Sequence, residues 1–348
     1  MIAIRVDGNE IIATGHVMRC LSIAEQIRKF GVEVRFVLAD DRPGQLIRNQ
    51  GFEYDVLDTI WDQLDLETEQ LCKYLQKREI DTMLLDTYYV TQEYLQNISH
   101  YTKIVYIDDL RKFAYPVHTV INYGAWVTED DYDKQECYAN GQRTQFLIGS
   151  QYVPLRDEFR YREFHVNKKV KRVLITTGGT DILNVAGGVL DELLHDDRTQ
   201  ELEYHVIVGC FNQNRDLLYS KAKINNNIFL HENVSNMAEW MRNCDVAISA
   251  AGTTTYELCA CGIPSICLEI ADNQEGAIAW EENGYMLYAG NAYKNRQLCM
   301  DNCRKYLVEY QNDYELRKEK SLRMQSLVDG LGAERIAQYL INGGIERC

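Results

Sequence analysis

The chain has 348 residues, of which 46% are hydrophobic and 26% are charged, as in ordinary globular proteins. This composition excludes a disordered chain, a collagen-like fibre and a low-complexity scaffold. A length of 348 predicts two domains, at about 100 to 200 residues per domain. The formal charge of −15 opposes binding to a nucleic-acid backbone or an anionic membrane, so we expect neither as a partner.

The chain contains eleven cysteines, whose number and spacing suggest neither disulfides nor a metal site. The number is odd, and no C-x-x-C pair occurs. We interpret the cysteines as buried thiols in a reducing compartment. The N-terminus, MIAIRVDGNE, has no basic segment leading into an apolar core, and no run of 18 apolar residues follows. We therefore expect a soluble, cytoplasmic protein.

Short apolar runs alternate with longer segments of helical periodicity, a pattern typical of a parallel sheet wound with crossover helices. The strands expected in the first half are 2–6, 33–38, 82–85, 103–107 and 119–122. Those expected in the second half are 172–176, 203–208, 227–230, 246–249 and 265–269. Because the pattern occurs twice, we predict an α/β protein with two doubly wound Rossmann-type domains.

The junction between the domains is expected within 149–171, where Pro154 and a dense mixture of charged and aromatic residues interrupt the apolar runs. We expect one domain at 1–150, a second at 170–330 and a helical tail at 331–348. The final helical stretch, 314–342, fits either domain. Two such domains facing each other across a cleft are a recurrent way to bind a nucleotide, because each sheet presents loops and helix N-termini at its carboxyl edge.

The loop after the first strand carries the first candidate for chemistry, Thr14-Gly15-His16. Apolar positions with helical spacing follow and end at Gly31, so Thr14 is the expected N-cap and His16 lies in the first helical turn. Arg19 shares the face of His16. A neutral imidazole there can accept a proton from water. Packing alone explains a histidine at this position equally well.

Polar residues follow two further strands. Asp86 and Tyr88 come after one, and Asp108 and Asp109 come after the next. Carboxylates at the carboxyl ends of parallel strands can orient a catalytic histidine or hold a sugar hydroxyl. Aspartate also commonly caps the following helix, so we expect at least one of Asp108 and Asp109 to be structural.

Two loops in the second half have the form of phosphate-binding turns, 176–181 (TTGGTD) and 249–257 (SAAGTTTYE). Small residues allow backbone N–H groups to approach a diphosphate, and the hydroxyls of Thr253 and Thr254 add donors. Glu257 can accept both hydrogens of a ribose cis-diol, although Thr254 and Glu257 also fit a capping box. The amides of Asn273 and Gln274 can contact phosphate or sugar, and turn chemistry explains the Asp272-Asn273 pair equally well.

Taken in order, these residues resemble the UDP-sugar hydrolases of pseudaminic acid biosynthesis, which remove UDP from UDP-2,4-diacetamido-2,4,6-trideoxy-β-L-altropyranose. The resemblance begins at Arg5–Leu21, with its T-G-H-V-M-R-C-L, and covers most of the chain to about residue 290. It continues through Asp86-Thr87-Tyr88, Asp108-Asp109, 149–159, Gly178-Gly179-Thr180-Asp181 with Asn184, 249–257 and Asn273-Gln274. The chain departs from the family at Ala13-Thr14, where members often have Ile-Gly.

The resemblance implies a GT-B fold with UDP held mainly by the second domain, and inverting C–O cleavage without a covalent intermediate, a metal or another cofactor. His16 would be the general base that activates water. Gly15 would help the loop approach the substrate, Arg156 would offset diphosphate charge, and Glu257 would hold the ribose. The other substrate-binding residues that we predict are Arg19, Asp86, Tyr88, Asp109, Gly178, Gly179, Thr180, Asp181, Thr253, Thr254, Asn273 and Gln274.

Two other functions fit the same residues. In a UDP-sugar glycosyltransferase of this fold, His16 would deprotonate an acceptor hydroxyl instead of water. The first half shows no apolar and basic cluster of the kind that a lipid-linked acceptor needs. A non-catalytic nucleotide-sugar-binding protein is the third alternative, and the pairing of His16 and Arg19 with the Glu257 loop argues against it. The oligomeric state cannot be inferred from the sequence.

Overall fold

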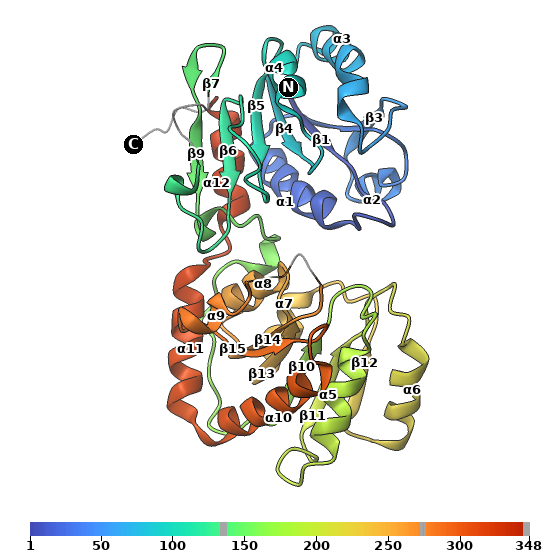
Figure 1. Cartoon of the computed structure of the whole chain (residues 1–348), viewed down its shortest axis with the longest axis vertical. Coiled ribbons are helices and arrows are strands. Elements are labelled where there is room, and N and C mark those ends of the chain that lie inside the picture. The colour runs from blue at the N-terminus through green and yellow to red at the C-terminus, as the bar shows by residue number, and fades with distance from the viewer. Residues whose placement is uncertain (133–137, 272–273, 275, 344–348) are drawn as a thin grey trace. The chain divides into compact units, whose positions relative to one another are not determined.

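The computed structural model describes residues 1–132, 138–271, 274 and 276–343, and it divides the chain into two compact units (Figure 1). Unit 1 comprises Met1–Asp157 together with the C-terminal segment from Gly330. Unit 2 comprises Glu158–Asp329. The chain leaves unit 1 inside the segment 149–171 and returns to it near the C-terminus.

Unit 1 is built on a seven-stranded parallel sheet with the order β3-β2-β1-β4-β5-β6-β9. A short antiparallel hairpin, β7-β8, lies outside this sheet. The strands are β1 (Ile2–Val6), β2 (Val34–Leu38), β3 (Glu53–Val56), β4 (Thr82–Asp86), β5 (Lys103–Ile107), β6 (Thr119–Asn122), β7 (Tyr138–Ala139), β8 (Gln142–Arg143) and β9 (Gln145–Ile148).

The helices of unit 1 cover both faces of its sheet. Apolar side chains of α3 and α4 join those of the strands in one buried cluster. On α1 the buried side chains include Val17, Cys20, Ala24 and Ile27, one residue per turn or so, as an amphipathic helix requires. The helices are α1 (Gly15–Lys29), α2 (Gly44–Asn49), α3 (Thr68–Arg78), α4 (Gln92–Ser99) and α12 (Gly332–Ile341).

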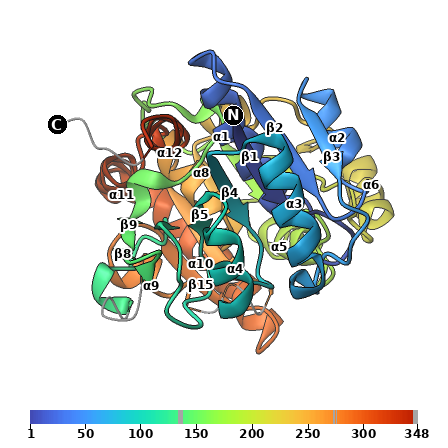
Figure 2. The ribbon, with the colours of Figure 1, turned by 90° about the horizontal axis from the view of Figure 1, so that it is seen from above.

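Helix α12 belongs to unit 1 and packs beside α1, as Figures 1 and 2 show from two directions. A side chain at Gly332 would collide with the backbone of Tyr152 and Val153, so glycine allows α12 to begin in close contact with that segment. The segment 314–342, which has a helical pattern, forms two helices, α11 (Tyr314–Leu327) and α12. The chain turns between them at Gly330, whose φ of +75° suits glycine.

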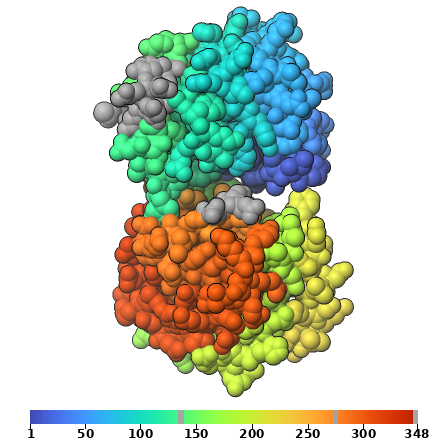
Figure 3. All heavy atoms as spheres, in the orientation of Figure 1, coloured from blue at the N-terminus to red at the C-terminus, as the bar shows by residue number. Residues whose placement is uncertain are grey.

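Unit 2 is built on a six-stranded parallel sheet with the order β12-β11-β10-β13-β14-β15. Its main core lies between this sheet and helices α5, α6 and α10. The surface of α10 and α11 belongs to the red-orange to red part of unit 2 in Figure 3. The strands are β10 (Arg172–Thr176), β11 (Glu203–Ile207), β12 (Ile228–His231), β13 (Val246–Ala250), β14 (Ser265–Glu269) and β15 (Leu287–Asn291). The helices are α5 (Val185–Leu194), α6 (Arg215–Ile224), α7 (Met237–Asn243), α8 (Thr254–Cys261), α9 (Ala279–Glu282), α10 (Arg296–Asn312) and α11 (Tyr314–Leu327).

The ten strands expected from the sequence are all present, each within one residue at either end, and the predicted α/β architecture of two doubly wound sheets is confirmed. The expectation missed β3, β9 and β15, which lie at the edges of the two sheets and are only partly buried, so their sequences lack a continuous apolar run. Among the described residues, no helix is both long and apolar enough to cross a membrane.

Candidate functional site

The candidate site of unit 1 lies at the carboxyl edge of its sheet, where β1 and β4 end side by side. Val6 and Asp86, the last residues of these strands, are register partners. The chain leaves β1 into a loop and enters α1 at Gly15, which places His16 in the first helical turn above the end of β4. The sheet order, with β4 next to β1, thus brings together residues 70 positions apart in the sequence.

His16 and Asp86 form a buried pair. His16 Nδ1 lies 2.6 Å from Asp86 Oδ1, and the two residues are only 6% and 1% exposed. His16 Nδ1 also lies 3.0 Å from Arg19 Nη2, which can only donate, whereas the carboxylate can only accept. Because the contact with Asp86 is the shorter one and Arg19 Nη2 already donates to Asp86, we assign the ring hydrogen to Nδ1. Nε2 of a neutral imidazole is then able to accept a proton. This is the arrangement that a general base needs.

Arg19 fixes the carboxylate of Asp86 from the other side. Its Nε and Nη2 donate to the two oxygens at 2.6 and 2.5 Å, and it also donates to Asp109, at 3.2 and 2.8 Å, and to the Tyr123 hydroxyl. Burial alone would raise the pKa of Asp86, but the Arg19 charge, the His16 imidazole and their hydrogen bonds together hold it well below its ordinary value. Asp86 therefore stays ionised.

Tyr88 completes the surroundings of His16. The two rings meet edge to face, with centroids 4.5 Å apart and an interplanar angle of 77°. Burial first, and then the Asp109 carboxylate, raise the pKa of Tyr88 to about 12. The hydroxyl is thus neutral at physiological pH.

Asp108 is the structural member of the Asp108-Asp109 pair, as expected for one of the two. Its buried carboxylate accepts from the backbone N–H groups of Leu110 and Arg111 at 2.9 and 3.1 Å, and from the hydroxyls of Tyr115 and Tyr132 at 2.8 and 2.6 Å. These four bonds shape the turn that presents Asp109 to Arg19.

The loop before α1 is shaped by its own polar groups. Asn9 Oδ1 accepts from the N–H groups of Ile11 and Ile12 at 2.8 and 3.0 Å, and Ala13 has a φ of +56°. Thr14 is the N-cap of α1, as predicted, although its side chain makes no capping bond. A side chain at Gly15 would meet no atom within 4 Å, so the space beside this residue is open.

The sequence did not predict a buried ionic network that links Arg5 of β1, and Asp7 directly after β1, to Glu67. Arg5 donates to Glu67 through two bonds of 2.9 and 2.8 Å and to Asp7 at 2.5 Å, and Tyr94 also donates to Glu67, at 2.9 Å. Asp7 in turn accepts from the N–H of Ala39 at 2.8 Å. A charged Arg5 inside an apolar strand was the available signal, but nothing local indicated Glu67 as its partner.

In unit 2 the first predicted loop follows β10. Gly178, Gly179 and Thr180 are exposed there, whereas Asp181 is buried. The Asp181 carboxylate accepts from the N–H groups of Val185 and Ala186 at 2.7 and 3.1 Å. Asp181 therefore supports the start of α5, while its three predecessors form the open turn.

The second predicted loop of unit 2 follows β13 and enters α8 at Thr254. Thr253 is the N-cap and its side chain makes no capping bond, so the expected capping box of Thr254 and Glu257 is not formed in the predicted way. Glu257 lies half-buried in the first turn of α8. Gln274 lies beside this loop, since its Nε2 would be 3.6 Å from a Cβ at Gly252.

The structure thus collects the predicted residues into two groups. In unit 1 it brings Gly15, His16, Arg19, Asp86, Tyr88 and Asp109 together, and it places Arg156, half-buried, just before the short helical turn Asp157–Phe159. In unit 2 the loops at Gly178–Asp181 and Thr253–Glu257 follow the adjacent strands β10 and β13. Asn273 lies outside the described residues. Tyr123 and Cys20, whose Sγ lies 3.4 Å from Asp86 Oδ2, are contacts that the sequence did not suggest.

Metal-binding side chains do not gather anywhere in the described part of the chain, where no three His, Cys, Asp or Glu residues come together in a suitable group. The described cysteines are free thiols, and all but Cys210 are buried, as expected from the sequence.

Comparison with known proteins gives relatives at low identity, and no family model matches. The chain is 29% identical over 285 residues to an uncharacterized protein of Methanocaldococcus jannaschii, covering 77% of this chain but only 55% of that protein. It is 26% identical over 293 residues to the UDP-2,4-diacetamido-2,4,6-trideoxy-beta-L-altropyranose hydrolase of Campylobacter jejuni, covering 81% and 96%. It is 22% identical to the spore coat polysaccharide biosynthesis protein SpsG of Bacillus subtilis, with 97% of each chain covered.

Solved structures share the fold along the whole chain. MurG of Acinetobacter baumannii superposes with a TM-score of 0.68 at 12% identity, over 98% of this chain and 99% of that one. The UDP-GlcNAc 2-epimerase of Neisseria meningitidis, bound to UDP-GlcNAc, superposes with a TM-score of 0.62 at 13% identity, over 98% and 100%. These likenesses confirm the predicted GT-B-like fold class, an α/β protein with two Rossmann-type domains.

Proposed function

We propose that the chain hydrolyses a UDP-linked 2,4-diacetamido-2,4,6-trideoxyhexose to UDP and the free sugar, a step of pseudaminic acid biosynthesis. The observation that carries the proposal is the 2.6 Å contact between His16 and Asp86, which provides a general base. The substrate class comes from the Campylobacter jejuni hydrolase, which the chain matches over 96% of that protein's length.

In the proposed reaction His16 Nε2 takes a proton from water as the water oxygen attacks the anomeric carbon of the sugar. The bond between that carbon and the UDP oxygen breaks in the same step. Because water displaces UDP directly, the configuration inverts and no covalent intermediate forms. Asp86 stabilises the imidazolium that results, as the aspartate of a catalytic triad does. Arg19 keeps Asp86 ionised and fixed in place.

The leaving UDP is proposed to bind to unit 2. Backbone N–H groups at the turn 178–180 and at the start of α8 suit the diphosphate, with the hydroxyls of Thr253 and Thr254 as further donors. Glu257 holds the ribose, and Asn273 and Gln274 contact phosphate or sugar. Together with Arg156, these groups stabilise the charge that develops on the leaving phosphate, so the proposed mechanism requires no metal.

The test is release of UDP and free sugar from the UDP-linked diacetamido-trideoxyhexose by purified protein in EDTA, without any acceptor. We expect both products in equal amounts and a sugar of inverted anomeric configuration in the first NMR spectra. Absence of UDP release would contradict the hydrolase proposal, and loss of activity in EDTA alone would contradict the metal-free mechanism.

A UDP-sugar glycosyltransferase is the second candidate, because the fold matches MurG over nearly the whole of both chains. His16 would then deprotonate an acceptor hydroxyl. The same assay separates the two, since a transferase releases UDP only when an acceptor is added. A non-catalytic nucleotide-sugar-binding protein would bind UDP and release none from the sugar.

A further inference from the structure

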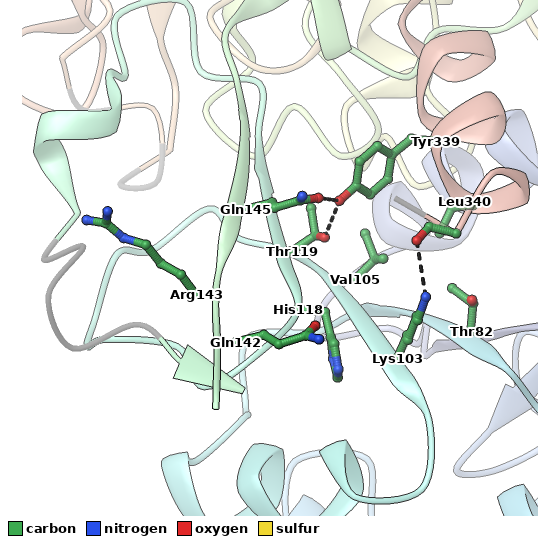
Figure 4. Close-up of a pocket in the computed structure, with 11 residues that line it drawn as sticks. Thr82, Lys103, Val105, His118, Thr119, Gln142, Arg143, Gln145, Tyr339 and Leu340 are labelled. Atoms are coloured by element: carbon green, nitrogen blue, oxygen red, sulfur yellow. Dashed lines mark hydrogen bonds between the residues drawn. The ribbon is translucent and has the colours of Figure 1, made fainter. Parts of the chain in front are cut away.

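Unit 1 contains a recess at the amino edge of its sheet, at the opposite end of the strands from His16 (Figure 4). The first residues of β4, β5, β6 and β9 line it, namely Thr82, Lys103, Thr119 and Gln145, and α12 contributes Tyr339 and Leu340. Asp86, at the other end of β4, is four residues from Thr82, or about 13 Å at about 3.3 Å per residue. The recess is therefore separate from the His16 site.

The lining of this recess is basic and contains no carboxylate. Among the described residues, 11 side chains or backbone segments line it, and they include Lys103, His118 and Arg143 but no Asp or Glu. The whole chain has 52 Asp and Glu against 37 Lys and Arg, so a cavity lined by one lysine, one arginine and no acidic residue departs from the rest of the molecule. Such a place favours an anion.

The basic groups retain hydrogen-bond capacity for a ligand. Lys103 Nζ donates to the carbonyl of Gly343 at 3.2 Å, which uses one of its three hydrogens. His118 Nδ1 accepts from the N–H of Ile104 at 3.1 Å, so the neutral ring carries its hydrogen on Nε2 and can only donate there. In Figure 4 the Gln142 side chain points toward His118, whereas the Arg143 guanidinium points away from Lys103.

The side-chain oxygens of Thr119, Gln145 and Tyr339 are already engaged with one another. The Tyr339 hydroxyl lies 2.6 Å from Thr119 Oγ1 and donates to Gln145 Oε1. What the recess offers a ligand is therefore mainly a positive charge and N–H donors, which match the oxygens of a carboxylate or phosphate. The cavity measures about 100 Å³, and a wider recess of about 640 Å³ adjoins it at Thr82, Lys103 and His118. The lining of the wider recess includes one carboxylate, Asp81, which lies 3.4 Å from the amino group of Met1. Together these spaces are large enough for a small metabolite.

We propose that Lys103 and His118 bind the carboxylate or phosphate group of an anionic metabolite of about monosaccharide size, whose remainder occupies the adjoining recess. The ligand also contacts α12, which packs on α1 and so connects this site to the helix that carries His16. The proposal does not depend on the proposed hydrolase activity.

The test follows the His118 ring by NMR, with a His118→Gln variant to assign its signals, during titration of the full chain. The probes are inorganic phosphate, glucose 6-phosphate and gluconate, with glucose as the neutral control. A site with a Kd of about 1 mM is about nine-tenths occupied at about 10 mM ligand. We expect an anion to shift the His118 signals and to raise the pKa of this ring, which burial and Lys103 lower in the free protein.

Lys103→Met should weaken binding about tenfold, since it removes one charged donor. Lys77→Met, which removes an exposed lysine on α3, should leave it unchanged. If the His118 signals shift only with inorganic phosphate and glucose 6-phosphate, the bound group is a phosphate. If they shift only with gluconate, it is a carboxylate. No shift with any of the three anions, or equal binding by Lys103→Met and wild type, would overturn the proposal. Lys103→Gln serves as the second variant if Lys103→Met fails to fold. Hydrolysis of the UDP-sugar by either variant reports separately on the His16 site.

Discussion

Arg19 holds Asp86 through two hydrogen bonds, from Nε to Oδ2 at 2.6 Å and from Nη2 to Oδ1 at 2.5 Å, in the geometry of a guanidinium paired with a carboxylate. The same Oδ1 contacts His16 Nδ1. One carboxylate therefore connects a fixed positive charge to the ring that we propose as the base. The predictions below follow from this connection and from the buried polar groups around it.

The first prediction concerns His16 itself. His16→Ala should lower turnover of the UDP-sugar by at least ~10²-fold, the lower range for loss of a general base, while UDP affinity stays unchanged. Steady-state kinetics and calorimetric titration with UDP measure the two quantities. His165→Ala, which removes an exposed histidine of unit 2, is the control and should behave as wild type. Normal turnover in His16→Ala would make this histidine a packing residue.

The second prediction concerns Asp86. Asp86→Asn keeps the shape of the side chain but removes the charge that stabilises the imidazolium and that selects the hydrogen on Nδ1. We expect kcat to fall by about 10²- to 10⁴-fold with a smaller change in KM. Asp62→Asn, at an exposed position, is the matched control. An unchanged kcat would show that Asp86 does not act through His16.

The pH dependence of stability gives a third prediction. The folded-state pKa of Asp86 is lowered, and its unfolded value is about 3.9. The ionised carboxylate therefore stabilises the fold above about pH 4, and this contribution is lost as the pH falls toward the lower folded pKa. The difference in the free energy of unfolding between wild type and Asp86→Asn should stay constant down to about pH 5 and shrink as the pH falls below about 4. Urea unfolding at several pH values measures it, and a difference that grows toward low pH would contradict the assignment.

The fourth prediction separates support from binding at Asp181. Asp181→Ala removes the acceptor for two N–H groups of α5 and should lower the free energy of unfolding by about 1 kcal/mol, with weaker UDP binding. Asp181→Asn keeps an acceptor oxygen, and asparagine tolerates the φ of +43°. This variant should therefore retain most of the stability and most of the affinity for UDP. If both variants lost UDP binding while remaining equally stable, the carboxylate charge would contact the ligand directly.

The fifth prediction concerns the network behind the site. Glu67→Ala leaves Arg5 buried without its main partner and should cost about 3–5 kcal/mol in the free energy of unfolding. The double variant Arg5→Met with Glu67→Leu should lose less, because the one charge that it leaves without its partner is Asp7. The Asp7 carboxylate keeps its bond from the Ala39 N–H, and burial raises its pKa, which favours uptake of a proton. Urea unfolding compares them. Equal losses of unfolding free energy in the single and double variants would contradict this prediction. They would show that the loss comes from the missing attraction between Arg5 and Glu67 and not from a buried charge left without a partner.

The sequence contained enough to place His16, Asp86 and Asp109 at strand ends, because apolar runs and the loops that follow them mark the carboxyl edge of a parallel sheet. It did not show which carboxylate meets His16. That choice depends on the strand order, which places β4 next to β1, and on the turn at Asp108, which directs Asp109 toward Arg19. Tyr123 and Glu67 had no local signal, since their partners are 104 and 62 residues away.

The caps of α1 and α8 show how far residue types alone can be used. Thr14 is the N-cap that the sequence predicts, whereas α8 has Thr253 at the N-cap instead of the Thr254 that the alternative capping box needs. Neither N-cap side chain makes a capping bond, so the side chains of Thr14 and Thr253 do not satisfy the first N–H groups of these helices. The residue types preferred at caps also suit ligand-binding loops, so sequence alone cannot separate the two roles.

The return of α12 to unit 1 has a consequence for how the protein is made. All residues of unit 2 are contiguous, so unit 2 can fold on the ribosome once Asp329 has emerged. Unit 1 begins first but lacks α12 until all of unit 2 and then residues 332–341 have been synthesised. The face of α1 that α12 covers stays open throughout that time, so the N-terminal unit is the later of the two to reach its finished state.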